Sequence, residues 1–339
     1  MRAWVLEEWG LDNLKEVDLP ELKLKADEIK VAFQAASLNY RDILVAQGLY
    51  NPKFNRPLVP CSDAYGEIIE VGSALSPTLI GRKVLTLFAP NWQAGPPNRS
   101  VLKETMGGPR QGVLQEYQNL KLDELVLLDT AERYTPHEWA TFPCAGVTAW
   151  NCLIEQAKLS AGHSVLFLGT GGVSLFGLQI AKLIGAKSLL LSSSPSKQQH
   201  ALDMGAQAVE NYKNNPKWSD WVLEQTQGQG VDVVLETGGA GTLEQSVRSA
   251  KVGGHISLIG VLGGHQKPLN ILPIIMKALK IQGAVVGNRQ HSQNLVRAFS
   301  ESSLKPVIHK TFSWDRVPQA FQELQRGHHL GKITVSFPS

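Results

Sequence analysis

The stretch Ser164-Val-Leu-Phe-Leu-Gly-Thr-Gly-Gly-Val-Ser-Leu-Phe-Gly177 decides the fold. Its apolar run at 165–168 predicts a buried strand and its glycines predict a turn. The apolar positions from Leu178 to Ile184 then recur at helical spacing. A strand, a glycine turn and a helix in this order are typical of a dinucleotide site, because the helix N-terminus offers free N–H groups to a pyrophosphate. An ordinary strand-to-helix turn is the alternative.

One position departs from the glycine pattern. Gly171 would let the backbone approach a pyrophosphate. The third glycine of G-x-G-x-x-G falls on Ser174. Its hydroxymethyl group is expected to push the helix and the strand slightly apart, because the glycine at this place serves close packing.

The segment Ser192-Ser-Ser-Pro-Ser-Lys197, which follows the second expected strand, favours NADP(H) over NAD(H). No acid that could bind a ribose 2′-hydroxyl occurs between Gly169 and Asp203. Serine hydroxyls and a lysine instead suit a 2′-phosphate. Alternatively, the segment is a polar loop that caps a helix over 197–204, with Ser196 at the N-cap.

Composition indicates a soluble globular protein of two domains. The chain has 339 residues, of which 43% are hydrophobic and 19% charged, and a net charge of +3. Lysines and arginines are spread out, so no nucleic-acid partner is expected. No run is long enough to span a membrane, and charges come too early for a signal peptide. The three cysteines form no C-x-x-C pair, which favours a cytoplasmic protein without disulfides.

Alternating helices and strands predict an α/β fold with a parallel, doubly wound sheet over 126–288. The expected strands are 164–168, 188–192, 208–212, 231–236, 255–259 and 281–286. Residues 1–125 are rich in short alternating strands, and a final strand over Gly331–Phe337 is expected to rejoin that first domain. The proline- and glycine-rich segment 89–112 predicts a long loop positioned to cover an active site.

Further motifs occur in order along the whole chain. They are Ser37-Leu-Asn-Tyr-Arg-Asp42, Pro60-Cys-Ser-Asp-Ala-Tyr-Gly66, Pro143-Cys-Ala-Gly-Val-Thr-Ala-Trp150, Glu236-Thr-Gly-Gly239, Gly253-Gly254 and Gly331-Lys332. With the glycine loop, they resemble the medium-chain dehydrogenase/reductase superfamily, in its zinc-free quinone-oxidoreductase-like or zinc-type alcohol dehydrogenase-like branch. The resemblance implies a GroES-like catalytic domain over 1–125 and 289–339 and a Rossmann NADP(H)-binding domain over 126–288.

The zinc ligands of that superfamily are not matched. Zinc-dependent members place a cysteine in the first motif, Gly-His-Glu in the second and a cysteine in the third. These positions here hold Asn39, Ser62 with Asp63, and Cys144. Zinc prefers thiolate, imidazole or carboxylate, so no metal is expected. The structural-zinc lobe is replaced by a loop over 90–112 without cysteine.

Without zinc, the oxidation of a plain alcohol lacks a Lewis acid. Hydride transfer to an enone or a quinone needs only proximity and hydrogen bonds to the developing enolate oxygen. The resemblance places Asn39 beside the nicotinamide, and Tyr40 and Tyr50 are the other candidate catalytic residues. A carbonyl reductase of the alcohol dehydrogenase kind and a non-enzymatic NADPH-binding protein are the alternatives.

Tyr40, Tyr50 and the nearby Asp42 also have structural interpretations. Tyr40 is equally explained as a core-facing aromatic residue, and Tyr50 as a residue that packs on Phe54. For Asp42, a helix cap or a salt bridge with Arg41 or Arg82 is favoured over catalysis.

The resemblance also implies the NADP(H) contacts. Thr148 would face the nicotinamide or the phosphates, Gly238 and Val261 the adenosine and the nicotinamide ribose, and Asn288 and Arg289 the nicotinamide end. The pyrophosphate set is Gly171, Gly172 and Val173, and the 2′-phosphate set is Ser193, Lys197 and Tyr212. Alternatively, Tyr212 is a packed strand-end aromatic residue and Arg289 forms a surface salt bridge.

The family suggests a homodimer that acts on a small-molecule substrate. Either the strand His255–Gly260 or the apolar run Asn270–Met276 is expected to form the contact across a sheet edge. The alternative is that the run 271–276 packs inside the monomer.

Overall fold

The computed structural model describes residues 1–338 in two compact units. The first unit holds residues 1–147 and the chain from 287 onward, and the second holds 148–286. The sequence placed these boundaries at 125/126 and 288/289. Residues 126–147 join the first unit because β7 (Leu125–Leu128) pairs with β5 (Lys83–Thr86) and α2 (Pro136–Ala140) packs on the same sheet. None of the described helices is long and apolar enough to cross a membrane.

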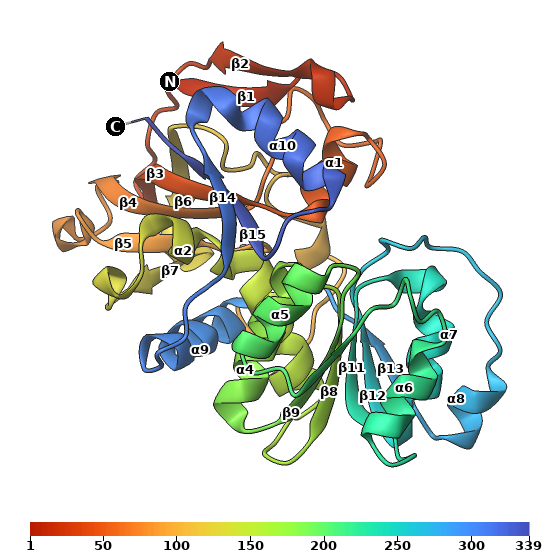
Figure 1. Cartoon of the computed structure of the whole chain (residues 1–339). Coiled ribbons are helices and arrows are strands. Elements are labelled where there is room, and N and C mark those ends of the chain that lie inside the picture. Colours follow the sequence, from red (N-terminus) through yellow and green to blue (C-terminus); the bar gives the residue numbers. More distant parts are fainter. Residues whose placement is uncertain (339) are drawn as a thin grey trace. The chain divides into compact units, whose positions relative to one another are not determined.

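The first unit is built on a seven-stranded sheet with the order β14-β15-β3-β4-β5-β7, in which β6 also pairs with β3 (Figure 1). The strands are β3 (Glu28–Leu38), β4 (Asp63–Val71), β5 (Lys83–Thr86), β6 (Tyr117–Lys121), β7 (Leu125–Leu128), β14 (Ile308–Phe312) and β15 (Lys332–Ser336). A separate hairpin joins β1 (Arg2–Leu6) to β2 (Leu14–Asp18). Strand β15 runs antiparallel to β3 with Ile333 opposite Leu38, so the predicted return of the final strand is confirmed.

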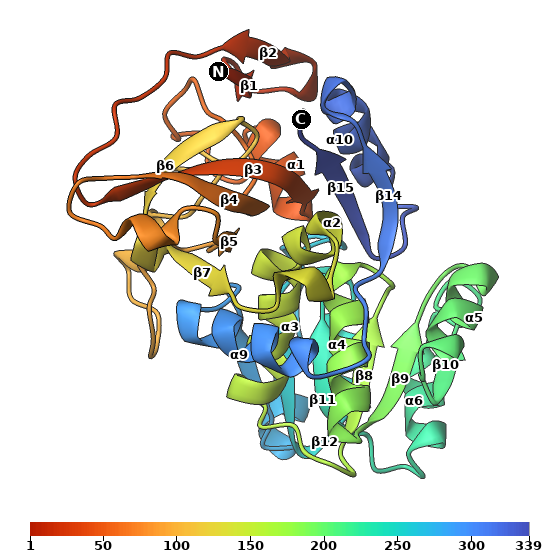
Figure 2. The ribbon, with the colours of Figure 1, turned by 90° about the vertical axis from the view of Figure 1, so that its left-hand side faces the viewer.

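Burial along β3 explains how this sheet is covered. Buried and half-buried residues alternate up to Phe33, as expected of a strand with one face on the core. From Ala35 to Leu38 every residue is buried; this part of β3 pairs with β15, and helices α2 and α10 both contact the strand. The helices of the unit are α1 (Tyr40–Ala46), α2 (Pro136–Ala140), α9 (Arg289–Ser300) and α10 (Val317–Arg326). Figure 2 shows α10 beside β14 and β15.

The second unit confirms the predicted doubly wound parallel sheet. Its six strands are, in spatial order, β10 (Ala208–Glu210), β9 (Lys187–Leu191), β8 (Ser164–Leu168), β11 (Val231–Glu236), β12 (Ala250–Leu258) and β13 (Lys280–Gly283). The chain winds outward in both directions from β8, as in dinucleotide-binding sheets. The first and fourth strands have the predicted bounds. The third ends at Glu210 and the last at Gly283, earlier than predicted, because the chain turns or leaves the ladder there.

Helices cover both faces of this sheet. Helix α4 (Gly172–Ile184) packs on the face that carries Phe167, and α6 (Trp218–Gln225) and α7 (Leu243–Ser249) pack on the face that carries Leu166. Figure 1 shows α7 in teal beside β11 and β12, and Figure 2 shows α6 beside β10. The other helices of this unit are α5 (Pro195–Asp203) and α8 (Leu272–Met276), and the short α3 (Val147–Trp150) leads into it.

Ser174 does not separate helix α4 from strand β8 as expected. Its side chain is buried, and Oγ donates a 2.8 Å hydrogen bond to the carbonyl of Leu168 at the strand end. The close approach is at Gly177, where a Cβ would lie 2.6 Å from Cε1 of Phe167. The hydroxyl therefore joins the two elements, and Gly177 provides the small residue that close packing needs.

Two expectations about the sheet edge are wrong. Strand β12, which contains His255, lies between β11 and β13 and is not an edge strand. The run 271–276 is no strand either, because it forms helix α8 with Pro273 in the first turn, where a missing N–H costs nothing. The edge strand on this side is β13.

Candidate functional site

The glycine turn between β8 and α4 leaves open space at a helix N-terminus. Gly169 has a φ of +75°, which favours glycine, and Gly171 is the N-cap of α4. A Cβ added at either glycine would meet no atom within 4 Å, and no side chain caps the helix. The first N–H groups of α4, from Gly172 and Val173 on, are thus available to an anion.

The serine segment after β9 does not cap a helix at Ser196, which was the alternative interpretation of its sequence. Helix α5 begins at Pro195 with Ser194 as N-cap, so Ser196 at the N-cap is wrong. The hydroxyls of Ser194 and Ser196 lie 3.0 Å apart, and neither caps α5. Ser193 and Lys197 are half-buried, and burial lowers the pKa of the Lys197 ammonium. Hydroxyls and an ammonium therefore gather at this strand end.

Tyr212 lies in the turn after β10 and does not end the third strand as expected. Its ring is 40% exposed, so it is not a packed strand-end residue. The carboxylate of Glu210 accepts the N–H of Asn211 at 2.6 Å and the Asn215 amide at 3.4 Å. These bonds hold that carboxylate within its own turn.

The turn after β11 is held by a buried carboxylate, Glu236. It accepts the N–H groups of Gly238 at 2.7 Å and Gly239 at 3.0 Å, together with the hydroxyls of Thr242 and Ser246. Gly238 is packed so closely that a Cβ would lie 2.3 Å from Oγ1 of Thr242.

Two further predicted cofactor residues of the second unit differ in exposure. Thr148 is buried in α3, whereas Val261 is exposed in the loop after β12. Of the two, only the Val261 side chain is open to solvent.

A buried polar cluster lies in the first unit around Asp63. Its carboxylate accepts the hydroxyl of Ser62 at 2.6 Å and the backbone N–H of Cys144 at 3.1 Å. Burial raises the pKa of Asp63, although the Lys332 ammonium attracts its charge. Burial also raises the pKa of the Cys144 thiol.

Asn39 follows strand β3 as the N-cap residue of α1 and lies beside this cluster. Its amide oxygen accepts a hydrogen bond from the Lys332 ammonium. Its amide nitrogen is buried and lowers the pKa of Asp63, but makes no hydrogen bond of ordinary geometry among the described residues. The sequence proposed Asn39 as a catalytic residue and gave Lys332 no role.

Asp42 is a capping residue, as favoured from the sequence. Its carboxylate accepts the N–H of Asn39 at 2.8 Å in the first turn of α1. The alternative salt bridge with Arg82 is wrong, because Arg82 pairs with Asp129 at 2.6 Å. Asp42 is fully buried, and burial raises its pKa to about 6.

Tyr40 and Tyr50 both present their rings to solvent, with 41% and 45% exposed. Tyr40 is therefore not core-facing. Tyr50 packs on Phe54 with 6.2 Å between ring centroids, as one alternative had it, and the Arg41 guanidinium lies 4.7 Å from its ring.

Arg41 joins α1 to the segment over 89–112. Its guanidinium donates to the carbonyls of Met106 and Gly108 and to the hydroxyl of Thr105. It lies over the Tyr50 ring and is also 4.9 Å from the ring of Phe88. This residue thus orients Tyr50, and sequence reasoning missed it because its partners come from distant loops.

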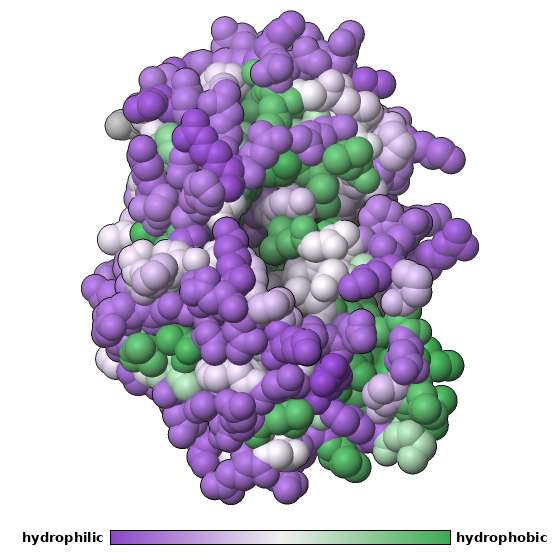
Figure 3. Space-filling view, turned by 45° about the vertical axis from the view of Figure 1, so that its right-hand side comes forward, coloured by the Kyte–Doolittle hydropathy of each residue, from purple (hydrophilic) through white to green (hydrophobic). Residues whose placement is uncertain are grey.

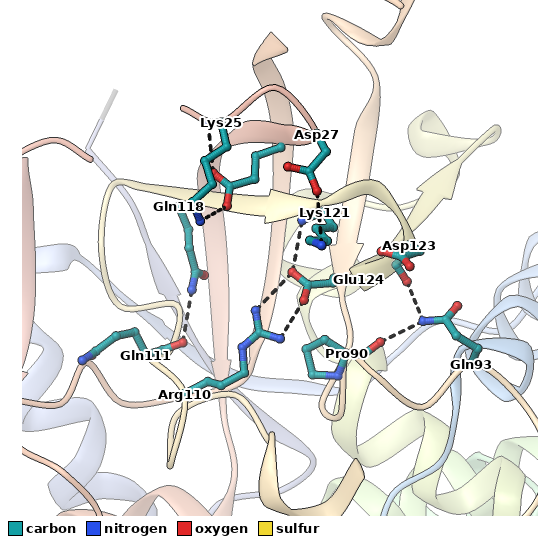
Figure 4. Close-up of polar contacts among 11 residues, drawn as sticks. Lys25, Asp27, Pro90, Gln93, Arg110, Gln111, Gln118, Lys121, Asp123 and Glu124 are labelled. Atoms are coloured by element: carbon teal, nitrogen blue, oxygen red, sulfur yellow. Dashed lines mark hydrogen bonds and ion pairs between the residues drawn. The ribbon is translucent and has the colours of Figure 1, made fainter. Parts of the chain in front are cut away.

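The remainder of that segment is bonded to the turn between β6 and β7 (Figure 4). Arg110 makes a paired ion contact with Glu124, at 2.7 and 3.1 Å. Gln93 donates to the carbonyls of Pro90 and Asp123. Trp92 is buried with its indole N–H on the Gly95 carbonyl, so it is a packing residue.

Asn288 and Arg289 begin helix α9 in the first unit. The Asn288 oxygen accepts the N–H of His291 at 2.9 Å, which makes it the helix cap. Arg289 forms no surface salt bridge within residues 1–338, and its Nε donates instead to the carbonyl of Leu125 at 2.9 Å.

Comparisons with known proteins agree with both units. Residues 25–130 match the model for the alcohol dehydrogenase GroES-like domain, and residues 172–301 match that for zinc-binding dehydrogenase. A zinc-type alcohol dehydrogenase-like protein of Schizosaccharomyces pombe is 36% identical over 96% of each chain. The chain belongs to the medium-chain dehydrogenase/reductase superfamily.

Members of this superfamily are nicotinamide-dependent oxidoreductases. The crystal structure of a putative alcohol dehydrogenase from Sinorhizobium meliloti superposes with a TM-score of 0.91 at 36% identity, covering 99% of this chain and 98% of that one. An acryloyl-coenzyme A reductase of Metallosphaera sedula is 26% identical over 96% of each chain. The family therefore includes both alcohol dehydrogenase-like and enoyl reductase-like relatives.

The two groups that the family implies differ in how well they fit these residues. The open glycine turn and uncapped N-terminus of α4 fit a dinucleotide pyrophosphate. The cluster around Asp63 does not fit zinc, because Asn39 and Ser62 are poor ligands and the Asn39 oxygen already accepts from an ammonium. Within residues 1–338, no three His, Cys, Asp or Glu side chains lie close enough together to hold a metal ion.

Asp42→Asn is predicted to remove a pH dependence of stability. The folded pKa of Asp42, about 6, exceeds its ordinary value of 3.8, so the folded state binds the proton more tightly. The wild-type protein then loses up to about 3 kcal/mol of stability as pH rises through this range. The asparagine still accepts the Asn39 N–H but carries no titrating carboxyl group, so the variant does not lose this stability as pH rises.

Urea unfolding at pH 4.5 and 7.5 measures the effect. The stability of Asp42→Asn relative to wild type should rise between the two pH values. The control Asp129→Asn alters a carboxylate whose side chain is 88% exposed and should follow the wild type. An equal difference between Asp42→Asn and wild type at both pH values would contradict the prediction.

Proposed function

We propose that this oxidoreductase transfers a hydride from NADPH to an enone or a quinone and needs no zinc. The observation that carries the proposal is the donor set around Asp63, in which an amide and a hydroxyl stand where zinc-dependent members have a thiolate and an imidazole. An activated double bond needs no Lewis acid if hydrogen bonds stabilise the enolate oxygen.

Three polar side chains of the first unit are candidates for those hydrogen bonds. Asn39 lies at the start of α1 with its amide fixed by Lys332. The hydroxyls of Tyr40 and Tyr50 belong to rings that are exposed, and Arg41 holds the Tyr50 ring. Bound NADPH would supply the hydride, and these residues would orient the acceptor and donate to its oxygen.

The cofactor preference rests on the strand-end segment of the second unit. Ser193 and Lys197, with Tyr212 from the turn after β10, are proposed to surround a 2′-phosphate, and the Asn211 amide beside Tyr212 donates to the Ser193 carbonyl. Gly171, Gly172 and Val173 would hold the pyrophosphate at the N-terminus of α4. Thr148, Gly238, Val261, Asn288 and Arg289 remain proposed contacts of the rest of the cofactor.

Two other functions are weighed against this one. Reduction of a saturated carbonyl is favoured by the alcohol dehydrogenase names of several relatives. Conjugate reduction is favoured by the acryloyl-coenzyme A reductase among them, since acryloyl thioesters are activated alkenes. A non-enzymatic NADPH-binding protein would bind the cofactor without turnover.

Enones or quinones are predicted to be reduced at least about tenfold faster, in kcat/KM, than saturated aldehydes and ketones. A tenfold ratio is about 1.4 kcal/mol in transition-state binding. The assay follows NADPH oxidation with crotonyl thioester, benzoquinone and cyclohexenone beside cyclohexanone and butanal. Faster reduction of the saturated carbonyls would favour the alcohol dehydrogenase alternative, and binding without any oxidation would favour the non-enzymatic one.

Wild-type protein is predicted to bind NADPH more tightly than NADH, and Lys197→Met to weaken NADPH binding about tenfold. The reason is the loss of one charge-assisted contact to the 2′-phosphate, while NADH binding stays unchanged. Tryptophan fluorescence quenching reports both titrations. The control Lys187→Met alters an exposed lysine at the start of β9, the strand that precedes the segment of Lys197. Wild-type preference for NADH would overturn the 2′-phosphate assignment.

A homodimer is proposed through the edge of the second unit's sheet. Strand β13 is the edge strand, and helix α8 before it exposes a group of apolar side chains. These are Ile271, Leu272, Ile275 and Met276, each between 58% and 72% exposed. Figure 3 shows hydrophobic side chains gathered at the lower right, over the second unit. Such a patch is typical of a protein interface, and a second copy offers a self-complementary cover.

Ile275→Glu is predicted to convert the dimer into a monomer, because two glutamates would be buried in the shared contact. Light scattering at low micromolar concentration measures the mass. The control Leu183→Glu alters an exposed apolar residue on helix α4 and should leave the dimer intact. A wild-type monomer would reject the proposal.

A further inference from the structure

Lys332 is a lysine held inside the first unit. Its side chain is 4% exposed at the first position of β15, which is followed by buried Ile333, Thr334 and Val335. The preceding Gly331 has a φ of +73°, and a Cβ there would lie 2.2 Å from the carbonyl oxygen of Val307. The backbone therefore enters β15 along a path that suits glycine and places the lysine in the interior.

The Lys332 ammonium is bound by two oxygens at the end of β3. Nζ donates to the carbonyl of Leu38 and to the side-chain oxygen of Asn39. Since β15 pairs with β3, and β3 pairs with β4 through Ser37 and Asp63, the sheet register brings these groups together. A buried lysine is stable only where such partners surround it.

The charges of this region balance. Asp42 and Asp63 are buried carboxylates; the Lys332 ammonium attracts the charge of both, and the Arg41 guanidinium that of Asp42. The Arg41 guanidinium donates three hydrogen bonds to the segment over 105–108. Lys332 is therefore the cation that contacts Asn39 directly.

We infer that Lys332 is a positioning residue for the reaction, and that it acts through Asn39. An amide side chain fits almost equally well in two orientations that exchange its oxygen and nitrogen. An ammonium has only donors, so it binds the oxygen and leaves the buried Nδ2 donor of Asn39 on the side of Asp63, whose pKa this donor lowers. It also draws charge toward the oxygen and so strengthens the remaining N–H donor. The inference rests on the proposed function in assigning Asn39 to the reacting end.

A double-mutant cycle tests whether Lys332 acts through Asn39. Lys332→Met is expected to lower kcat about 10- to 100-fold with an unchanged KM for NADPH, the range seen when a supporting residue is lost. Asn39→Ala is expected to lower kcat by at least as much. The double variant should be no slower than Asn39→Ala alone, because the same interaction is lost only once. Losses that multiply would overturn the inference.

A second cycle separates positioning from charge balance. Lys332→Met leaves Asp63 buried without its nearby cation, so Tm should fall. Adding Asp63→Asn removes the unpaired buried carboxylate, so Tm should rise again while kcat stays low. If kcat recovered together with Tm, Lys332 would only balance charge and the inference would be overturned. Lys310→Met, on the exposed side of the neighbouring strand β14, is the control and should change neither.

A failure of the proposed function would look different. No enone or quinone would then be reduced by any variant, including the wild type. The Tm values of the Lys332 and Asn39 cycle would still report their coupling, and additive losses in Tm would overturn the contact itself.

Discussion

The ammonium of Lys332 donates to the Leu38 carbonyl and to the Asn39 side chain at the point where strand β3 gives way to helix α1. Three strands must pair in the correct register before this contact can form. Strand β15 returns from the far end of the chain to lie beside β3, and β3 carries β4 with Asp63. A buried ammonium or carboxylate without a partner would lower the stability of the fold. The pairing register of these strands therefore also fixes the positions of the candidate site residues.

In the second unit, the ends of the strands rather than a buried charge cluster position the candidate site residues. Its parallel strands end at one edge, where the glycine turn, the serine segment and the turn held by Glu236 follow β8, β9 and β11. No side chain caps the helix that follows any of these turns, but only the first turn is open above two glycines. The candidate anion site and the candidate specificity segment are adjacent because β8 and β9 are paired.

The sequence was most informative where one periodic pattern coincided with a turn signal. Strand β8 and the start of α4 follow from Ser164 to Gly177 alone. The run 271–276 was misjudged because an apolar stretch this short fits a strand or a helix equally well. The contact of Lys332 with Asn39 could not be predicted from the sequence, because the two residues lie 293 positions apart and are brought together only by strand pairing. A lysine before Ile-Thr-Val in a buried strand was the one available signal.

Metal analysis of active enzyme tests the central claim most directly: a fixed ammonium, rather than zinc, is the cation at this site. The wild-type protein is produced with excess zinc, dialysed, and measured for zinc per chain beside its specific activity. We predict far less than one zinc per chain with full activity, unchanged by a chelator, because the site offers poor ligands and a like charge. One zinc per chain, lost together with activity on chelation, would contradict the account.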